Sequence, residues 1–240
     1  MKKLLFFAGL IVLTTSAIVS QDLKLEEILE KYYKANGFDA LLKVNTIVMS
    51  GTNIQQDAML LKVTRMRPDK YLMAFDVQDI TAYQGYDGQT AWWTTPWTGN
   101  PKPQVMPEER AKDLRARSDF DTPIFDWKRK GHQAELTGVD TLGKMPVYKI
   151  KLTRKDGGVE YYLIDNKDFM LQKKLTYRML RGKETEIETV FSDYRKVKGV
   201  WFAFKTEMLV GGQPYSQTQF DVIDLNPPVD EKIFKMPAAR

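Results

Sequence analysis

Hydrophobic and polar residues alternate along most of the chain, and this period of two predicts a protein built mainly of β-strands. The alternation is clearest in residues 184–191, where three glutamates on one face alternate with Thr185, Ile187 and Thr189 on the other. The predicted strands are residues 47–54, 58–66, 70–78, 80–86, 90–95, 147–154, 159–165, 169–179, 184–194, 200–210 and 216–225, with a further extended stretch that starts at Ala134.

Helical spacing replaces the alternation near the N-terminus. Residues 22–36 carry apolar side chains three and four positions apart, and we expect Asp22 to cap this helix. Gly37 suits the left-handed conformation that ends a helix, and a short helical turn is expected at residues 38–44.

Two more helices are predicted in the middle of the chain. Residues 107–117 begin with a proline and two glutamates, as helix N-termini do, but their apolar stripe is thin, so we expect this helix on the surface. Thr122 and Pro123 form a cap and first residue for a helix that Gly131 would stop after Lys130.

One hairpin carries the most distinctive residues of the chain. Asp87 and Gly88 form a two-residue turn signal, because both central positions of such a turn need a positive φ. The strand after it contains Trp92 and Trp93, which must point to opposite faces. Residues 97–106 contain Pro101 and Pro103 and are predicted to form a loop.

About eleven antiparallel strands with one apolar face form a sheet wide enough to curl. The predicted helices are too short to cover the concave face, so we expect an apolar pocket between sheet and helices. The residues predicted to line this cavity are Met59, Leu61, Val63, Tyr71, Met73, Phe75, Trp92, Ile187, Phe202, Phe204 and Phe220.

The N-terminus has the three parts of an export signal. Lys2 and Lys3 precede an apolar run, and a more polar exit ends near Ser20, where we expect cleavage. The chain has no cysteine, which a lipid-anchored bacterial protein would need at the cleavage site. We therefore expect an exported, soluble, unanchored protein with one domain over residues 21–240. The net charge of +5 fits either affinity for anionic lipid or an ordinary solvated surface.

The sequence offers little for catalysis. It has one histidine, His132, and neither a nucleophile elbow nor a phosphate-binding loop. The glutamates at 184, 186 and 188 are best explained as a solvated sheet face. We expect no enzyme activity, no cofactor, no metal site and no nucleic-acid binding, and we expect a monomer.

The tryptophans leave two interpretations open. Buried, Trp92 or Trp93 would fill the core of the curled sheet while its neighbour packs under the following loop. Exposed, Trp93 and Trp97 would form a platform for sugar rings, and the protein would be a glycan-binding module. The many methionines at strand positions favour a pocket that adapts to flexible apolar ligands, although each could be ordinary core.

In their order and spacing, several motifs resemble one known family over nearly the whole chain from residue 21. They are an N-terminal amphipathic helix, Arg67-Pro68 after a strand, Tyr86-Asp87-Gly88-Gln89-Thr90-Ala91-Trp92-Trp93-Thr94-Thr95-Pro96, Thr122-Pro123 and Phe234-Lys235-Met236-Pro237. Together they resemble the LolA-type periplasmic lipoprotein carriers. The resemblance implies an unclosed, strongly curved antiparallel half-barrel whose concave apolar face is covered by helices.

The same resemblance implies a function. Such a carrier moves the acyl chains of lipoproteins through the periplasm, from an inner-membrane donor complex to an outer-membrane acceptor. A half-barrel lipid sensor is the related alternative. In the family the arginine of the Arg-Pro pair holds the lid, which makes Arg67 the expected latch. The expected lid residues beside it are Thr122, Pro123, Ile124 and Trp127. A solvated arginine in a turn is the other interpretation of Arg67.

Overall fold

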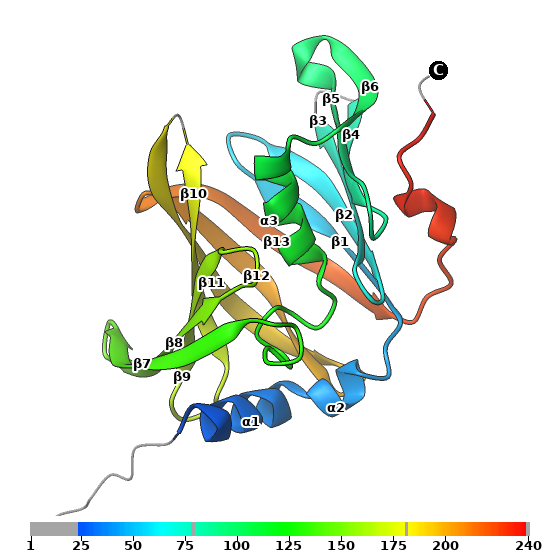
Figure 1. Cartoon of the computed structure of the whole chain (residues 1–240). Coiled ribbons are helices and arrows are strands. Elements are labelled where there is room, and N and C mark those ends of the chain that lie inside the picture. The colour runs from blue at the N-terminus through cyan, green and yellow to red at the C-terminus, as the bar shows by residue number, and fades with distance from the viewer. Residues whose placement is uncertain (1–23, 78–79, 181, 239–240) are drawn as a thin grey trace, which may run out of the picture.

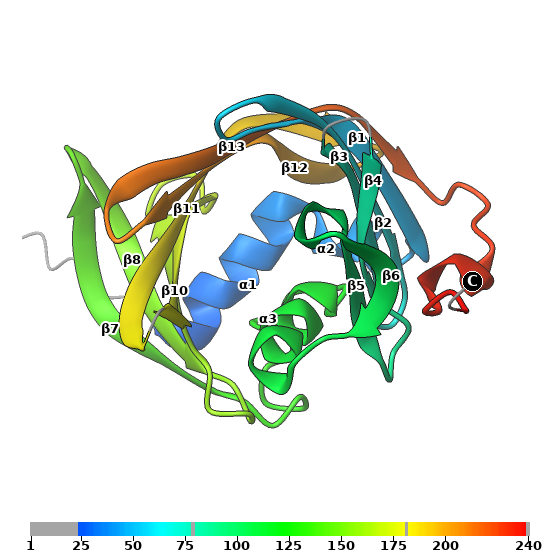
Figure 2. The ribbon, with the colours of Figure 1, turned by 90° about the horizontal axis from the view of Figure 1, so that it is seen from above.

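A single antiparallel sheet of thirteen strands curves around the helices without closing on itself (Figures 1 and 2). It is seen in a computed structural model that describes residues 24–77, 80–180 and 182–238. The strand order is β6-β5-β4-β3-β2-β1-β13-β12-β11-β10-β9-β8-β7. Two meanders, β1 to β6 and β7 to β13, are therefore joined where β1 pairs with β13. The predicted fold class, an open half-barrel of strands with a few helices, is confirmed.

The strands follow the predicted alternation closely, and most begin and end within a few residues of the predicted positions. Their bounds are β1 Thr46–Ile54, β2 Ala58–Met66, β3 Lys70–Val77, β4 Ile80–Tyr86, β5 Ala91–Thr95, β6 Asn100–Val105, β7 Gln133–Leu142, β8 Met145–Thr153, β9 Val159–Asp165, β10 Leu171–Leu180, β11 Lys183–Val197, β12 Val200–Val210 and β13 Gln213–Leu225.

The predicted loop over residues 97–106 is wrong, because most of it is strand β6. A short 3₁₀ turn, η1 (Pro96–Thr98), leads into this strand, which pairs with β5 and ends the strand order. Pro101 and Pro103 each lack an N–H, and a strand at the border of a sheet needs hydrogen bonds on one side only. The prolines are therefore tolerated at the one place in a sheet where they cost little.

The turn between β4 and β5 also differs from the prediction. Four residues, 87–90, join the strands, and only Gly88 among them has a positive φ, of 97°. The Asp87 carboxylate accepts the backbone N–H groups of Gln89 at 2.9 Å and Thr90 at 2.7 Å. This side-chain turn satisfies the backbone without the two-residue geometry.

Two helices near the N-terminus lie across the lower end of the curved sheet in Figure 1, and the view from above in Figure 2 shows them through the curve. They are α1 (Leu25–Asn36) and α2 (Phe38–Leu41), separated by Gly37 at φ 77°, as predicted. The apolar stripe of α1 is buried and packs into a core cluster with residues of β8, β9 and β12. The predicted cap Asp22 and the export signal lie outside the described residues.

Residues 122–130 do not form the predicted helix but a series of turns. Thr122 and Asp126 have φ values of 66° and 51°, which an α-helix does not allow. Local backbone hydrogen bonds make the turns, such as that from the Phe125 N–H to the Thr122 carbonyl, and side chains add further bonds. The Tyr33 hydroxyl donates to the Ile124 carbonyl at 2.7 Å, and Lys130 Nζ donates to the Thr122 carbonyl at 2.7 Å.

The third helix, α3 (Glu108–Ser118), covers the inner side of β3, β4 and β5. Ala111 and Leu114 form its thin apolar stripe and are buried against β2 to β5, so the helix is less peripheral than predicted. After β13, the chain ends in a 3₁₀ turn, η2 (Glu231–Phe234). Phe234 is completely buried.

Candidate ligand cavity and its lid

A cavity of about 590 Å³ lies between α3 and the concave face of the sheet. Small-molecule sites in proteins typically occupy about 300–1,000 Å³. Its lining residues are Asn53, Gln55, Met59, Leu61, Val63, Tyr71, Met73, Phe75, Gln84, Trp93, Trp97, Met106, Arg110, Asp113, Leu114, Arg117, Arg178, Thr206, Met208, Tyr215, Ser216, Thr218 and Phe220.

One wall of the cavity is almost entirely apolar and comes from β2 to β5. On β2 the inward residues alternate with outward ones, so Leu61 is buried while Leu60 is 68% exposed. The strand register places Phe75 directly opposite Leu61 and Met73 opposite Val63. Four methionines line the cavity, and their flexible side chains let a pocket adapt to its contents.

The opposite wall is polar and positively charged. Arg110, Asp113 and Arg117 come from α3, and Arg178 reaches in from β10. Asp113 Oδ2 lies 2.7 Å from Arg178 Nε, so an ion pair connects α3 to the far side of the half-barrel. The cavity is therefore amphipathic. The sequence interpretation missed these four residues, although three of them recur on α3 at positions i, i+3 and i+7.

The structure brings many of the predicted cavity residues to this site. Met59, Leu61, Val63, Tyr71, Met73, Phe75 and Phe220 line the cavity. Phe202 and Phe204 also face inward, but they pack into the core around α1 and α2. Ile187 is buried elsewhere in the sheet. Phe202 and Phe204 thus face the part of the concave surface that α1 and α2 fill.

Trp92 does not line the cavity either, because it points to the other face of β5 from Trp93. Its indole is 1% exposed, and Nε1 donates to the Phe234 carbonyl at 2.7 Å. Trp93 and Trp97 both line the cavity, and the Trp97 ring packs beside Phe75 at 6.1 Å between ring centroids. The expected cavity role of Trp92 is thus replaced by a contact that holds the C-terminal tail.

Arg67 follows β2 and joins three parts of the chain. Its Nε donates to the Val44 carbonyl at 2.5 Å, and Nη2 donates to the Leu41 carbonyl, at the end of α2, at 2.8 Å. Nη1 pairs with the Asp121 carboxylate at 2.5 Å, and the guanidinium lies 4.3 Å from the centre of the Phe120 ring. This residue is therefore not a solvated turn arginine.

Arg65 holds the next segment in a similar way. It donates to the Asp119 carbonyl at 2.7 Å and the Arg117 carbonyl at 3.3 Å, just after and at the end of α3. Its guanidinium also lies 5.3 Å from the Phe120 ring centre, so Phe120 contacts two arginines. Burial lowers the pKa of Arg65, and the neighbouring acidic groups oppose that shift.

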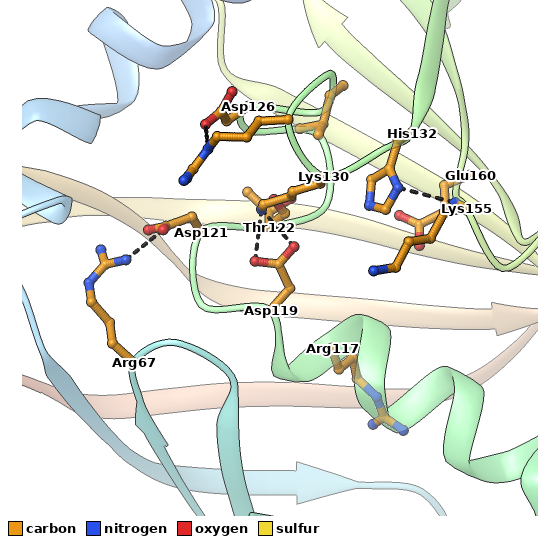
Figure 3. A network of polar contacts seen from close by, with 12 residues as sticks. Arg67, Arg117, Asp119, Asp121, Thr122, Asp126, Lys130, His132, Lys155 and Glu160 are labelled. Carbon is orange, nitrogen blue, oxygen red and sulfur yellow. Dashed lines mark hydrogen bonds and ion pairs between the residues drawn. The ribbon is translucent and has the colours of Figure 1, made fainter. Parts of the chain in front are cut away.

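Further ion pairs fix the segment after α3 (Figure 3). Lys130 Nζ lies 2.8 and 2.6 Å from the two Asp119 oxygens. Among the expected lid residues, the Thr122 carbonyl accepts a hydrogen bond from Lys130. Pro123 and Ile124 are buried, and Trp127 packs against the core around α1. Arg67 contacts both α2 and the segment 119–131, through Leu41 and Asp121.

Chemically reactive groups are few in the described part of the chain. No group of three or more His, Cys, Asp or Glu residues there could hold a metal ion. His132 accepts the Lys155 N–H at 3.1 Å, and burial followed by nearby Lys130 lowers its pKa. The buried Glu160 bonds to Arg154 and to Tyr162. No helix in these ranges is both long and apolar enough to cross a membrane.

A curved, unclosed antiparallel sheet with helices and a cavity inside defines the half-barrel class of proteins. Among half-barrels, the fold of this chain is similar to that of LolA-like proteins. The chain is similar to a domain assigned to outer-membrane lipoprotein sorting from Vibrio parahaemolyticus, with a TM-score of 0.61 at 12% identity over 87% of this chain and 94% of that one. It is also similar to a LolA superfamily protein from Nitrosomonas europaea, with a TM-score of 0.60 at 13% identity over 89% and 98% of the two chains.

A DUF1329 family protein from Desulfovibrio piger has a TM-score of 0.62 at 11% identity, over 89% of this chain and 99% of that one. No protein-family model and no curated protein sequence matches the chain. TM-scores of 0.60 to 0.62 show that the folds are alike, and identities of 11–13% show nothing beyond the fold. The expected LolA-like architecture is confirmed at that level.

Proposed function

We propose that the protein is a carrier that binds the acyl chains of lipoproteins or other lipids in the cavity beside α3. The observation that carries this proposal is the continuous apolar wall of β2 to β5, which faces a hollow instead of a packed core. Two of the structural neighbours are named for lipoprotein sorting or the LolA superfamily, which supports the same reading.

Burial of an acyl chain supplies the binding energy in this proposal. Each CH₂ group removed from water contributes about 0.8 kcal/mol, so even a partly inserted chain binds favourably. The function needs no catalytic group, and the protein is not an enzyme in this account. It works as a monomer in the periplasm, taking its cargo from an inner-membrane donor and passing it to an outer-membrane acceptor.

Arg67 acts as the latch of this carrier. It bonds to α2 and to Asp121 in the segment after α3, so a movement of either element must break its hydrogen bonds. Cargo entry and release then depend on how often those bonds open.

Displacement of a polarity-sensitive fluorescent fatty acid tests the proposed function. The purified protein should bind the probe, and a phospholipid should displace it. Phe75→Asp should abolish binding, because an unpaired carboxylate in an apolar site costs several kcal/mol. Leu60→Asp, on the outward face of β2, is the matched control and should bind normally. Equal probe binding by both variants would contradict the assignment of the cavity.

A further inference from the structure

The charged groups of the cavity gather on one side of it. Arg110, Asp113 and Arg117 occupy one face of α3, since residues three and four positions apart lie together on a helix. Arg178 reaches the same place from β10. The wall of β2 to β5 opposite them is apolar. A bound molecule would therefore meet both positive charge and hydrocarbon-like surface in the same cavity.

The positive charge is only partly neutralised by the protein. Asp113 pairs with Arg178, and the two side chains are each 26% exposed. Arg178 Nε is buried and makes no well-aligned hydrogen bond even with this carboxylate nearby. Across the ranges that the structure describes, neither Arg110 nor Arg117 takes part in an ion pair. Only the guanidinium of Arg178 thus has a carboxylate partner in the cavity, while Arg110 and Arg117 are exposed there.

The remaining arginine of α3 has a partner of its own. Arg115, two residues before Arg117, pairs with Glu108 and does not line the cavity. Burial lowers the pKa of Arg178, Asp113 opposes this shift, and the like charges of Arg117 and Arg110 add to it. The cluster at the cavity is therefore a place where an incoming anion would relieve repulsion between cations.

We propose that Arg110, Arg117 and Arg178 bind the phosphate of an anionic amphiphile whose acyl chain lies along the apolar wall. This inference rests on the proposed carrier function and narrows its cargo to acyl compounds with an anionic headgroup. A guanidinium presents two parallel donors that match two phosphate oxygens, and such charge-assisted pairs are among the stronger hydrogen bonds. Free inorganic phosphate offers the same oxygens without the chain.

A matched pair of soluble lipids separates the headgroup from the chain. Lysophosphatidic acid and monoacylglycerol with the same acyl chain differ only in the phosphate, and inorganic phosphate is the third ligand. The wild-type protein should bind lysophosphatidic acid about tenfold to a hundredfold more tightly than monoacylglycerol, as expected for charge-assisted hydrogen bonds. Inorganic phosphate alone should bind far more weakly than either lipid.

Variants then assign the preference to the cluster. Arg117→Gln, and more strongly Arg110→Gln with Arg117→Gln, should reduce affinity for lysophosphatidic acid at least tenfold more than affinity for monoacylglycerol. Circular dichroism and melting temperatures close to those of the wild type would show that the variants fold. Arg115→Gln carries the same loss of charge on the same helix outside the cavity and should keep the preference.

Three other outcomes are possible, and each would reject either the headgroup site, the lipid assignment or the proposed function. Equal affinity of the wild type for both lipids would reject the headgroup site and leave the carrier proposal standing. Phosphate binding as tight as that of the phospholipid would identify a free-anion site and reject the lipid assignment. Binding of neither lipid would reject the proposed function itself.

Discussion

At the scale of single residues, the arginines around Phe120 show why this chain uses arginine and not lysine. A guanidinium has five donors in a planar fork and no acceptor, so it can bond to several carbonyl groups at once. Arg67 uses three of its nitrogens on three different residues, Leu41, Val44 and Asp121. A lysine ammonium could not span these positions in the same plane.

Removal of the latch should speed exchange more than it weakens the fold. Hydrogen bonds to a charged group contribute about 1.5–3 kcal/mol, which corresponds to one to two orders of magnitude in an opening equilibrium. Arg67→Leu should therefore raise the off-rate of the fluorescent fatty acid by about that factor, with a modest fall in melting temperature. Stopped-flow exchange and thermal unfolding measure the two effects.

Arg129→Leu is the suitable control for this prediction, because Arg129 lies in the same segment with a side chain that is 81% exposed. Arg65→Leu is not neutral, since Arg65 is bonded to the end of α3. Identical exchange rates in the wild type and Arg67→Leu would rule out the latch. A collapse of stability would make Arg67 a purely structural residue.

Glu160 makes stability depend on pH. Burial alone would raise the pKa of its carboxyl, but Lys174, Tyr162 and Arg154 together hold it below the ordinary value of 4.5. A carboxyl whose folded pKa is depressed contributes stability above its unfolded pKa and loses it as the pH falls through the folded value. The free energy of unfolding should therefore decrease on acidification below about pH 4.5.

Glu160→Gln tests this assignment through urea unfolding at several pH values. The variant removes the carboxylate partner of Arg154 Nη1 and Lys174, while Arg154 keeps its pair with Asp156. It should therefore be about 1–3 kcal/mol less stable at pH 7 and show a shallower decline in acid. Glu135→Gln removes a carboxylate that is 61% exposed and should keep the wild-type profile. An unchanged acid profile in Glu160→Gln would show that other groups control the transition.

At the scale of elements, the C-terminal tail is held to the sheet by a side chain of β5. Trp92→Phe removes the donor of the bond to the Phe234 carbonyl and should cost about 1–3 kcal/mol, because that buried carbonyl loses its partner. Trp97→Phe, at a ring that is 55% exposed, should change stability by less than about 0.5 kcal/mol. Equal urea midpoints for the two variants would contradict the clamp.

Elements whose signal is local were predictable from the sequence, and elements decided by distant contacts were not. Alternation reports directly which face of a strand is buried, so β2, β9 and β12 have the predicted bounds. The prolines of β6 are harmless only because that strand lies at the border of the sheet, which no local pattern reveals. The cap signal at Thr122 does not produce a helix, because distant residues bond to this segment: Tyr33 bonds to the Ile124 carbonyl and Arg67 to Asp121.

The candidate site follows the same rule. Period-two spacing places Met59, Leu61, Met73 and Phe75 on one face, and these residues do line the cavity. The same spacing selects Phe204, but α1 and α2 fill the hollow there. Where a concave face is filled and where it stays open depends on helix docking, which the alternation does not encode.

At the scale of the whole molecule, α3 closes the space between the two meanders. Its apolar stripe packs against β2 to β5, while Asp113 pairs with Arg178 on β10. The helix thus both forms a wall of the cavity and presents the arginine cluster to it. A helix with only two buried apolar residues, Ala111 and Leu114, thus provides much of the charged lining of the cavity.

Export is a separate prediction at this scale. The N-terminal pattern of charge, apolar run and polar exit should direct the chain across the inner membrane and be removed near Ser20. Fractionation of cells followed by N-terminal sequencing should find a protein in the periplasm that begins near Gln21. Intact Met1 in the cytoplasmic fraction would contradict this prediction and the carrier account with it.

Mass spectrometry of the protein purified intact from its own cells tests the central claim most directly. The wild-type protein and Leu60→Asp should each carry an acyl-containing compound that organic solvent releases, whereas Phe75→Asp should carry none. Wild-type protein that contains no acyl compound as isolated, and takes up none when mixed with phospholipid vesicles, would contradict the account.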